Sequence, residues 1–595
     1  MYVKKTEELK NFLTGRPEGL FLYSAPKTGG KSYLFTRPLR VIRCNNLKSL
    51  ITGLKTVSEF TRQGYYAAGF MAYEAGYGFE KKFRRVKTGL KTPFLEFGIY
   101  KAPHVFSKTD ICALLPFYKN RFSVSPLKFS EGFKSYKKKF RRIMKLINNG
   151  DVYQVNHCFN AGFHFQGLAA SLFAALCETQ PVAYASFIRR KDKTIVSLSP
   201  ELFFDAKGRE ITMRPMKGTL LKDKKVKNPS KMLKNEKGIA ENVMIVDLLR
   251  NDLGRICETG SISAPKLFEL EEYRTLYQMT STIRGTLKGN ADFAGVIKAL
   301  FPSGSVTGAP KISAMNIIHK TEDTPRGVYT GAIGFACQSR SVFSIPIRTI
   351  EISGNNGVMG IGSGIVHDSK AAPEYKECLG KASFLAELAD NHSIIESILL
   401  KNGRYFLLKL HLKRMQKSAA FFGIKFRRGD FKKALKNLRL KNPRGEFKAR
   451  VLLAPDGKIR AQAARLVPLP GCKIAISPLK TDSLNIYLYH KTENRAFYDN
   501  DFKRYKRKGF GDVIYTNEKG EITEAHSSNI FAEINGVFYT PPVSCGLLPG
   551  TFREYLLKKN PSLYKERVLY PKDLKNADNL YLVNSVRGFV KAALV

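Results

Sequence analysis

The stretch DNHSIIESILLKNGRYFLL, residues 390–408, divides the chain into two parts. It begins with a polar break that ends the helix-like segment KECLGKASFLAELA, whose apolar residues share one helical face. It continues as two strand-like runs joined by Asn402-Gly403, a dipeptide that favours a two-residue hairpin turn. We therefore predict one domain over residues 1–388, which ends in a helix, and a second over residues 389–595, which begins with a hairpin.

Length and composition agree with this division, because 595 residues are too many for one ordinary domain. No apolar run reaches the roughly 18 to 20 residues that span a bilayer. The first residues, MYVKKTEELKNFL, lack the apolar core of a signal peptide. The nine cysteines show no zinc-like spacing and indicate reduced thiols. We expect a cytoplasmic protein without a membrane partner.

The net charge is the feature that suggests nucleic acid, since 99 Lys and Arg oppose 50 Asp and Glu, a formal +49. Residues 391–595 carry 39 basic and 17 acidic side chains, a net +22, and the rest of the chain carries +27, so the excess is not confined to one arm. We expect no nucleic-acid partner, because no recognised motif accompanies the charge. A nucleic-acid-binding protein on an inactive enzyme scaffold is the alternative from another functional class, and it predicts steeply salt-dependent binding.

The first reactive pair lies in SPELFF (199–204) and RPMKGT (214–219). Between them the sequence predicts a hairpin with its turn at 207–208, which would put Glu201 and Lys217 on neighbouring strands. A carboxylic acid and an amine in one site suit acid catalysis combined with a nucleophile or base. A salt bridge on an edge strand is the structural alternative.

Two further segments supply carboxylates. EKGIAENVMIVDLLRNDLGRI (236–256) predicts a helix with Glu241 beside its apolar face. The residues of that face are Ile239, Val243, Val246 and Leu249. In GIGSGIVHDSKAAPEYKE (360–377), Glu374 and Glu377 are spaced i, i+3 and project from one face of a helix. Together with Glu241 they would form an oxygen site suited to Mg²⁺.

The segment FPSGSVTGAPKISAMNII (301–318) is a Gly- and Ser-rich loop that opens a helix. Such a helix N-terminus binds anions well, although the spacing is not that of a P-loop. A tight turn that feeds a helix is the plainer interpretation.

These four segments, in their order along the chain, resemble the chorismate-utilising enzymes, in particular the aminodeoxychorismate synthase component I branch. The resemblance covers roughly residues 55–388 and includes GYYAAGFMAYEAGYGFE (64–80) and GVYTGAIGF (327–335). It implies an α+β fold of two layered antiparallel sheets with helices. The branch uses ammonia from a separate glutamine amidotransferase subunit, which this resemblance implies as a partner.

The resemblance also implies residue roles. Glu241, Glu374 and Glu377 match the magnesium-binding glutamates, and Glu201 matches the acid that assists departure of the C4 hydroxyl of chorismate. The positions that match contacts to the substrate chorismate are Thr307, Tyr329, Arg348, Gly364 and Lys381.

Lys217 separates the branches of this family. Anthranilate synthases resemble PIAGT at this motif, whereas this chain has PMKGT and keeps the lysine of aminodeoxychorismate synthases. The implied reaction is attack by the Lys217 amine on C2, followed by ammonia at C4. At the position of Gln154, isochorismate and salicylate synthases resemble a Lys-Val pair, whose lysine acts as the base that activates water at C2. A glutamine cannot act as that base.

Four segments of the second part, HLKRMQKSAAFFGI (411–424), HKTENRAFYDN (490–500), ITEAHSSNIFAEINGVFYTPP (522–542) and GLLPGTFREYLL (546–557), resemble the fold-type IV pyridoxal-phosphate enzymes. This α/β family includes branched-chain and D-amino acid aminotransferases and aminodeoxychorismate lyase. Its members are commonly dimers, so a homodimer through the second domain is implied.

By this resemblance Lys491 is the lysine that binds pyridoxal 5'-phosphate covalently and acts in catalysis, and Glu524 pairs with the pyridine nitrogen. The other cofactor positions are Arg414 and Thr551 at the phosphate, Leu548 on the ring, and Ser585 with Asn584 near the phosphate or substrate.

The two resemblances together imply synthesis of para-aminobenzoate, the folate precursor. The first domain would convert chorismate to 4-amino-4-deoxychorismate, and the second would eliminate pyruvate from it to give 4-aminobenzoate. The alternative is an anthranilate synthase component I-like domain fused to an amino-acid aminotransferase-like domain.

Overall fold

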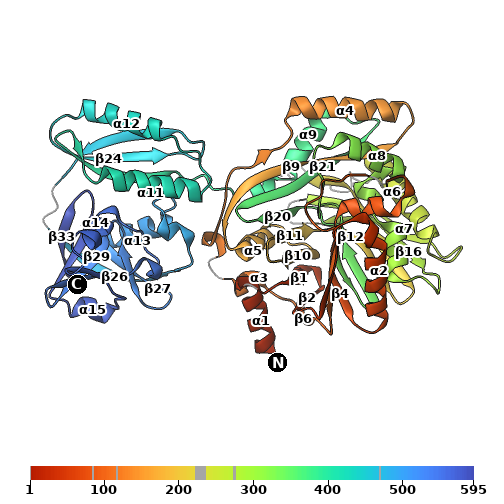
Figure 1. Cartoon of the computed structure of the whole chain (residues 1–595), viewed down its shortest axis with the longest axis horizontal. Helices are drawn as coiled ribbons and strands as arrows, with labels where there is room; N and C mark the ends of the chain where they lie inside the picture. The colour runs from red at the N-terminus through yellow and green to blue at the C-terminus, as the bar shows by residue number, and fades with distance from the viewer. Residues whose placement is uncertain are drawn as a thin grey trace. The chain divides into compact units, whose positions relative to one another are not determined.

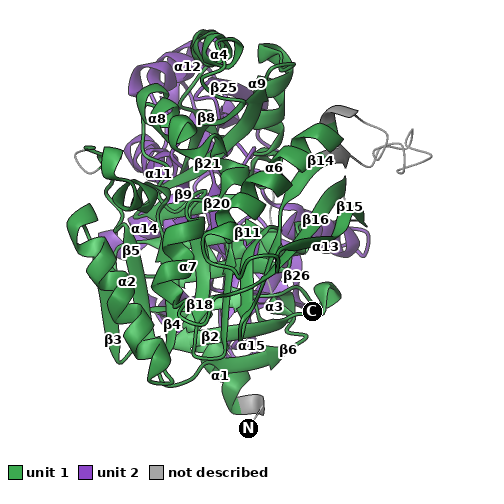
Figure 2. Cartoon of the chain, turned by 90° about the vertical axis from the view of Figure 1, so that its right-hand side faces the viewer, with its two compact units in different colours: residues 1–116, 127–163, 169–388 green, residues 117–126, 164–168, 389–595 purple. Residues whose placement is uncertain are grey.

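The computed structural model describes most of the chain, and Figure 1 shows its helices and strands in order. The described residues are 2–15, 17–83, 86–115, 118–221, 236–272, 276–467 and 471–595. They form two compact units, coloured separately in Figure 2. Unit 1 comprises residues 1–116, 127–163 and 169–388, and unit 2 comprises residues 117–126, 164–168 and 389–595.

Two antiparallel sheets form the framework of unit 1, although residues 122–124 and 164–167 of the first sheet belong to unit 2. In spatial order, the first contains β17 (Gly308–Ala309), β9 (Gln154–Gly167), β21 (Asn356–Val366), β20 (Thr349–Ser353), β11 (Thr194–Ser199), β10 (Tyr184–Arg189), β1 (Gly19–Tyr23), β2 (Lys31–Thr36) and β6 (His104–Ser107), with β8 (Lys128–Phe129) and β7 (Phe122–Val124) beside β9. The second contains β14 (Met216–Leu221), β16 (Leu276–Thr286), β13 (Glu210–Arg214), β12 (Leu202–Lys207), β19 (Arg340–Ser344), β18 (Ala332–Ala336), β4 (Tyr66–Met71), β5 (Leu95–Tyr100) and β3 (Arg40–Cys44), with β15 (Ser263–Glu272) beside β16.

The two sheets pack face to face through one cluster of buried side chains. Phe35 and Ile188 come from the first sheet, and Phe70 and Phe335 come from the second. The rings of Phe35 and Phe335 lie 5.9 Å apart between centroids. Burial of this apolar surface from both sides holds the layers together. The predicted α+β fold of two layered antiparallel sheets is confirmed.

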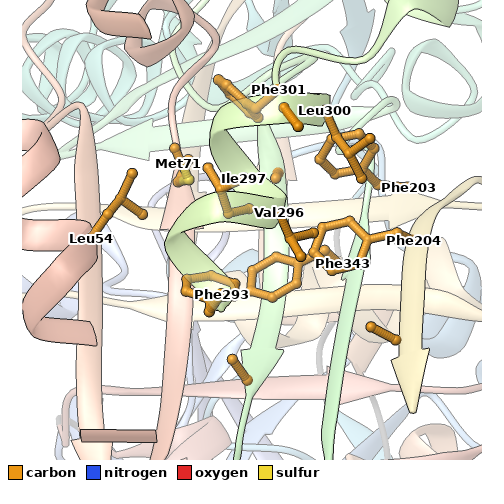
Figure 3. Close-up of a cluster of buried hydrophobic side chains, with 14 of the residues drawn as sticks. Leu54, Met71, Phe203, Phe204, Phe293, Val296, Ile297, Leu300, Phe301 and Phe343 are labelled. Atoms are coloured by element: carbon orange, nitrogen blue, oxygen red, sulfur yellow. The ribbon is translucent and has the colours of Figure 1, made fainter. Parts of the chain in front are cut away.

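Helices cover the outer face of the second sheet. The helices of unit 1 are α1 (Tyr2–Thr14), α2 (Leu47–Arg62), α3 (Ile111–Leu114), α4 (Phe133–Asn148), α5 (Ala169–Thr179), α6 (Glu236–Gly254), α7 (Phe293–Leu300), α8 (Lys311–Thr321), α9 (Ala371–Gly380) and α10 (Ser383–Ala386). Figure 3 shows Phe293 of α7 packed on the sheet: its ring centroid lies 5.4 Å from that of Phe343, which stacks on Phe204 at 5.3 Å. This core fixes α2, α6 and α7 on the sheet.

Helix α6 forms where the sequence predicts it, but the prediction of its buried face is wrong at Val243, which is 43% exposed. Asn242 is buried instead, and its Oδ1 accepts a hydrogen bond from Ser281 Oγ at 2.6 Å. This polar contact with β16 turns the helix so that Asn242 faces the sheet. Glu241 is therefore half-buried beside that face.

Unit 2 contains a small sheet and a larger mixed sheet. The small sheet is β23 (Arg404–Tyr405), β22 (Ile394–Lys401), β24 (Glu446–Leu453) and β25 (Ile459–Arg465), with α11 (Leu408–Phe421) and α12 (Arg428–Lys441) against it. The predicted turn between β22 and β23 is confirmed: Asn402 and Gly403 both have positive φ, +47° and +74°, as a type I′ turn requires.

The larger sheet has the α/β character predicted for the second domain, because β26 pairs in parallel with both of its neighbours. Its strands are β28 (Ile522–Ala525), β27 (Asp512–Asn517), β26 (Cys472–Thr481), β33 (Gly588–Leu594), β32 (Asn579–Asn584), β29 (Asn529–Ile534), β30 (Val537–Thr540) and β31 (Tyr564–Glu566). Its helices are α13 (Ala496–Lys506), α14 (Thr551–Lys559) and α15 (Pro571–Lys575). Among the described residues of both units, no helix is long and apolar enough to cross a membrane.

Candidate active sites

Glu201 and Lys217 come from consecutive parts of one folded segment. Glu201 directly precedes β12, and β12 pairs with β13, with Leu202 opposite Arg214. Pro215, which has no N–H to donate, separates β13 from β14, and both strands pair in turn with β16. Lys217 therefore lies on β14, which pairs with β16 and not with β12. The prediction that Glu201 and Lys217 lie on neighbouring strands is wrong. The two side chains still share a site, because each shifts the pKa of the other.

The Glu201 carboxyl is buried, and Ser305 Oγ donates to its Oε1 at 2.8 Å. Burial raises the pKa of Glu201 to about 7, although the Ser305 hydrogen bond and the Lys217 charge act in the opposite direction. A carboxyl with this pKa can hold a proton at neutral pH and donate it to a leaving group.

Burial lowers the pKa of the Lys217 amine, while the carboxylates of Glu241 and Glu201 oppose that shift. An amine with a lowered pKa is a better nucleophile near neutral pH. A Cβ atom placed on Gly364 would lie 3.6 Å from Lys217 Nζ and 2.9 Å from Gln154 Nε2. Lys217, Gln154 and Gly364 therefore meet at one point.

The Gln154 amide at this point is 1% exposed, and neither Oε1 nor Nε2 has a hydrogen-bond partner within the described part of the chain. A buried amide costs free energy unless a partner satisfies it. A polar ligand beside Lys217 would supply such partners, so the arrangement is that of a binding site.

Two further predicted substrate positions lie against β21, the strand that carries Gly364. Lys381 Nζ donates to Gly362 O at 2.8 Å. The Tyr329 ring packs on Gly360, where an added Cβ would lie 2.2 Å from its Cδ1. The structure therefore brings Gly364, Lys381 and Tyr329 to one strand.

Thr307 and Arg348 are placed by other contacts. Thr307 Oγ1 donates to Ser303 O at 2.8 Å, and its carbonyl accepts from Asn156 N at 2.9 Å, so its loop is attached to β9. Arg348 Nη1 donates to Gln180 Oε1 at 2.7 Å. Thr307 thus joins the strand that carries Gln154, whereas Arg348 is engaged beyond the end of α5.

The three glutamates predicted to bind Mg²⁺ come from two helices, Glu241 from α6 and the other two from α9. Ser369 Oγ donates to Glu374 Oε1 at 2.8 Å, and Lys381 pairs with Glu377 at 2.8 Å. Across the described ranges, no three His, Cys, Asp or Glu side chains lie close enough together to hold a metal ion. The carboxylate chemistry suits Mg²⁺, but the ligand set is not assembled, and the metal site stays a prediction.

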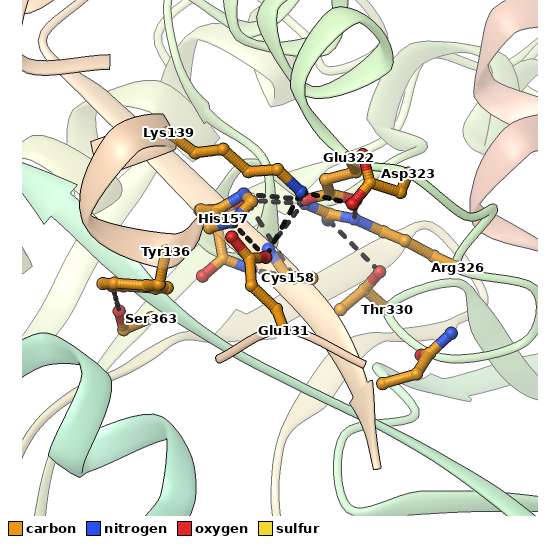
Figure 4. A network of polar contacts seen from close by, with 12 residues as sticks. Glu131, Tyr136, Lys139, His157, Cys158, Glu322, Asp323, Arg326, Thr330 and Ser363 are labelled. Carbon is orange, nitrogen blue, oxygen red and sulfur yellow. Dashed lines mark hydrogen bonds and ion pairs between the residues drawn. The ribbon is translucent and has the colours of Figure 1, made fainter. Parts of the chain in front are cut away.

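Arg326, which the sequence analysis missed, lies beside Glu322 and Thr330 in a network of polar contacts (Figure 4). Its guanidinium also joins two backbone segments of this site, because it donates to Asn156 O at 2.5 Å on β9 and to Val306 O at 2.9 Å, next to Thr307. It also forms a bidentate pair with Glu322 at 2.7 and 2.9 Å and lies 4.3 Å from the centroid of the Tyr73 ring. The Glu–Arg spacing of four residues was the available signal.

In unit 2, three of the predicted cofactor residues line one cavity: Lys491, Glu524 and Leu548. Lys491 follows a short 3₁₀ turn, η7 (Ile486–Tyr489). Residues from other segments complete the wall, among them Asn120, Asp482, Tyr487, Arg495 and Tyr498.

Two of the ionisable groups that line this cavity, Lys491 and Glu524, are both shifted towards neutrality. Burial lowers the pKa of Lys491 to about 7, and the charges of Arg495 and Arg414 act in the same direction. Burial raises the pKa of Glu524 to about 7, although Glu524 Oε2 accepts from Leu548 N at 3.2 Å. The amine is therefore available as a base or nucleophile near neutral pH.

Arg414 and Thr551, the predicted phosphate positions, are joined by a buried chain that the sequence analysis missed. Arg414 forms a bidentate pair with Glu396 at 2.7 and 2.9 Å. His411 Nδ1 lies 2.6 Å from Glu396 Oε2, and its Nε2 lies 3.3 Å from Thr551 Oγ1. Burial alone would raise the pKa of Glu396, but Arg414 and His411 lower it to about 2. The single charge in the apolar strand IIESILL was the signal for Glu396.

Ser585, the last predicted cofactor position, is brought to β22, where its Oγ donates to Ser397 O at 3.4 Å. The neighbouring Asn584 donates from Nδ2 to Ser528 Oγ at 3.0 Å. Ser397 follows Glu396 directly on β22, so Ser585 contacts the strand next to the residue that pairs with Arg414.

Comparison with known proteins assigns each part of the chain to a family. Residues 20–387 match the family of chorismate binding enzymes, and residues 393–595 match amino-transferase class IV. Aminodeoxychorismate synthase component 1 of Klebsiella aerogenes is 32% identical over 340 residues, which cover 53% of this chain and 75% of that protein. The Bacillus subtilis protein of the same name is 37% identical over 246 residues, 40% of this chain and about half, 52%, of the relative.

The solved structure of anthranilate synthase component I from Streptococcus pneumoniae covers 63% of this chain and 91% of its own, at 26% identity and a TM-score of 0.51. The chain therefore shares the fold of that anthranilate synthase component I over the matched part.

We predict that covalent capture of pyridoxal 5'-phosphate by Lys491 accelerates as the pH rises through about 7, because only the neutral amine attacks the cofactor carbonyl and burial lets Lys491 lose its proton there. The growth of the visible absorbance band after mixing apoprotein and cofactor, between about pH 5 and pH 10, measures the rate. A rate that still rises near pH 10, as for an ordinary lysine, would contradict the prediction.

Proposed function

The chain belongs to the chorismate binding enzymes through residues 20–387 and carries an amino-transferase class IV domain over residues 393–595, and from this we propose that it is a bifunctional enzyme of para-aminobenzoate synthesis. The first site would convert chorismate and ammonia to 4-amino-4-deoxychorismate. The second would eliminate pyruvate from that product to give 4-aminobenzoate. The observation that carries the proposal is the half-buried Lys217 side chain beside the buried Glu201 carboxyl, with pKa values shifted towards each other.

In the first reaction, the Lys217 amine would attack ring carbon C2 of chorismate. The double bonds shift, and the C4 hydroxyl leaves as water with the proton that Glu201 holds near neutral pH. Ammonia then attacks C4 and expels the Lys217 amine, which restores the enzyme. Gln154, whose buried amide lacks a partner among the described residues, would hydrogen-bond the substrate.

Glu241, Glu374 and Glu377 would hold Mg²⁺, whose role when bound is to fix a carboxylate of chorismate. The steps described above balance without any electron gained or lost by the ion. Lys381, which pairs with Glu377, would have to exchange that contact when the ion binds.

In the second reaction, the residues of the cavity fit pyridoxal 5'-phosphate, which supplies an electron sink when bound. Lys491 would hold the cofactor covalently, with Glu524 at the pyridine nitrogen and Leu548 on the ring. Arg414 and Thr551, joined through Glu396 and His411, would face the phosphate. Once displaced by substrate, the neutral Lys491 amine would take the proton from C4 and return one to the departing enolpyruvyl carbon, so that the ring becomes aromatic.

Partners follow from the same assignment. A separate glutamine amidotransferase component would supply the ammonia, and two copies of the chain would associate through the second domain. Ammonium salts would replace the amidotransferase in vitro.

The product assay tests the proposal directly. Purified protein with chorismate, an ammonium salt, Mg²⁺ and pyridoxal 5'-phosphate is expected to form 4-aminobenzoate and pyruvate, identified by mass. Without pyridoxal 5'-phosphate, 4-amino-4-deoxychorismate should accumulate instead. Anthranilate as the product would overturn the assignment and favour the anthranilate synthase and aminotransferase alternative.

Two lysine variants should separate the activities. Lys217→Ala removes the nucleophile and is expected to lower 4-amino-4-deoxychorismate formation by at least about 10³-fold, while leaving elimination from supplied intermediate unchanged. Lys491→Ala should abolish the visible absorbance of bound cofactor and stop the reaction at the intermediate. Lys207→Ala, at the exposed last residue of β12, is the matched control. Loss of both activities in either active-site variant would argue against independent sites.

A further inference from the structure

A segment from the first half of the sequence belongs to unit 2. We call residues 118–126 and 164–168 the arm; they are part of unit 2, coloured purple in Figure 2. Within the arm, β7 pairs in antiparallel fashion with the end of β9, with Phe122 opposite Gly167 and Val124 opposite Phe165. The arm is thus an ordered two-stranded element.

The arm binds the loop before the cofactor lysine through a charged pair. Arg121 Nε donates to Asp482 Oδ2 at 2.7 Å, and Nη2 donates to Oδ1 at 3.1 Å. The side chains are 14% and 6% exposed, so water screens the pair little. Asp482 in turn shapes the loop, because its Oδ1 accepts from Leu484 N at 3.2 Å and its carbonyl accepts from Asn485 N at 2.8 Å.

A second contact holds the same loop four residues before Lys491. Tyr487 OH donates to Asp390 Oδ1 at 2.5 Å, and Ser123 Oγ of the arm donates to Asp390 Oδ2. The Asp390 N–H also donates to Val124 O at 2.8 Å. Asp390 therefore ties Tyr487, in η7, to β7 of the arm.

These contacts converge on the wall of the second cavity. Asp482, Tyr487 and Lys491 all line it, and so does Asn120 of the arm. The far end of the loop is fixed separately, because Ile395 N donates to Lys491 O at 2.7 Å. The arm thus supplies the constraint on the part of the loop that precedes the lysine.

We propose that Arg121, from the first half of the chain, is a positioning residue for the loop that carries Lys491, so that the second activity requires the arm. The proposal rests on the assignment of this cavity to pyridoxal 5'-phosphate and deepens it. Removal of the guanidinium leaves the buried Asp482 carboxylate without this pair and frees the loop to move. A displacement of about 1 Å at a catalytic group is enough to cost about 100-fold in rate.

The test uses the full chain. Arg121→Ala is expected to lower kcat for pyruvate release from supplied 4-amino-4-deoxychorismate about 10- to 100-fold, with the first activity unchanged. The pH at which the rate of covalent cofactor capture by Lys491 is half-maximal should also shift, because the surroundings of Lys491 change. Arg121→Lys should recover part of the rate, since an ammonium can still pair with Asp482. Lys119→Ala removes an exposed cation two residues before Arg121 that does not line the cavity, and this variant should behave as the unmodified chain.

Hydrogen exchange of the apoprotein supplies a readout that does not depend on the cofactor. Peptides covering residues 482–490 should exchange faster in Arg121→Ala and in Asp482→Asn, but not in Lys119→Ala. Unchanged exchange together with unchanged kcat in Arg121→Ala overturns the proposal. If Arg121→Ala does not fold, Asp482→Asn decides in the same way. An unmodified chain that releases no pyruvate and shows no visible band would overturn the assigned function, while the exchange measurement would still judge the role of Arg121.

Discussion

The buried guanidinium of Arg326 is the interaction on which the first site depends. It joins a carbonyl of β9 to a carbonyl of the loop before Thr307, while Glu322 neutralises its charge and Tyr73 covers its face. β9 carries Gln154, and Gln154 meets Lys217 at Gly364. Because a guanidinium offers five donors in a fixed plane, one side chain can fix two backbone segments in position. The face-to-face packing of the two sheets then holds this arrangement away from water.

Both candidate sites use the same physical device. Each buries one amine and one carboxyl in a common environment, and burial disfavours the charged form of both groups. The amines become neutral more easily, and the carboxyls keep their protons to a higher pH. In the first site this pairing suits a reaction in which a lysine forms a bond to carbon and an acid protonates a leaving group. The units reach this state on unrelated frameworks, a pair of antiparallel sheets in one and a mixed sheet in the other.

Much of the fold could be read from local patterns. The Asn402-Gly403 turn, helix α6 and the hairpin of β12 and β13 form where the sequence predicts them, since turn chemistry and apolar periodicity act over a few residues. The errors arise where a distant partner decides. Val243 is exposed because Asn242 bonds to Ser281 on β16, and Lys217 lies on a different strand pairing because Pro215 interrupts the ladder. The glutamates predicted to bind Mg²⁺ lie on α6 and α9, and their spacing in the sequence cannot report whether the carboxylates meet.

The sequence by itself determined the family of each of the two parts and predicted Lys217 and Lys491 as the reactive lysines, because the motifs that indicate them, such as PMKGT and HKTEN, are contiguous. Only the tertiary structure decided which groups support them. No motif assigns a role to Arg326, Glu396, His411 or Arg121, although His411 begins the segment 411–424 that resembles the pyridoxal-phosphate enzymes. Each becomes significant through a partner that is distant in sequence or lies on another element. Residues 118–126, which belong to unit 2, are the clearest case, because Arg121 pairs there with Asp482, 361 positions away in the chain.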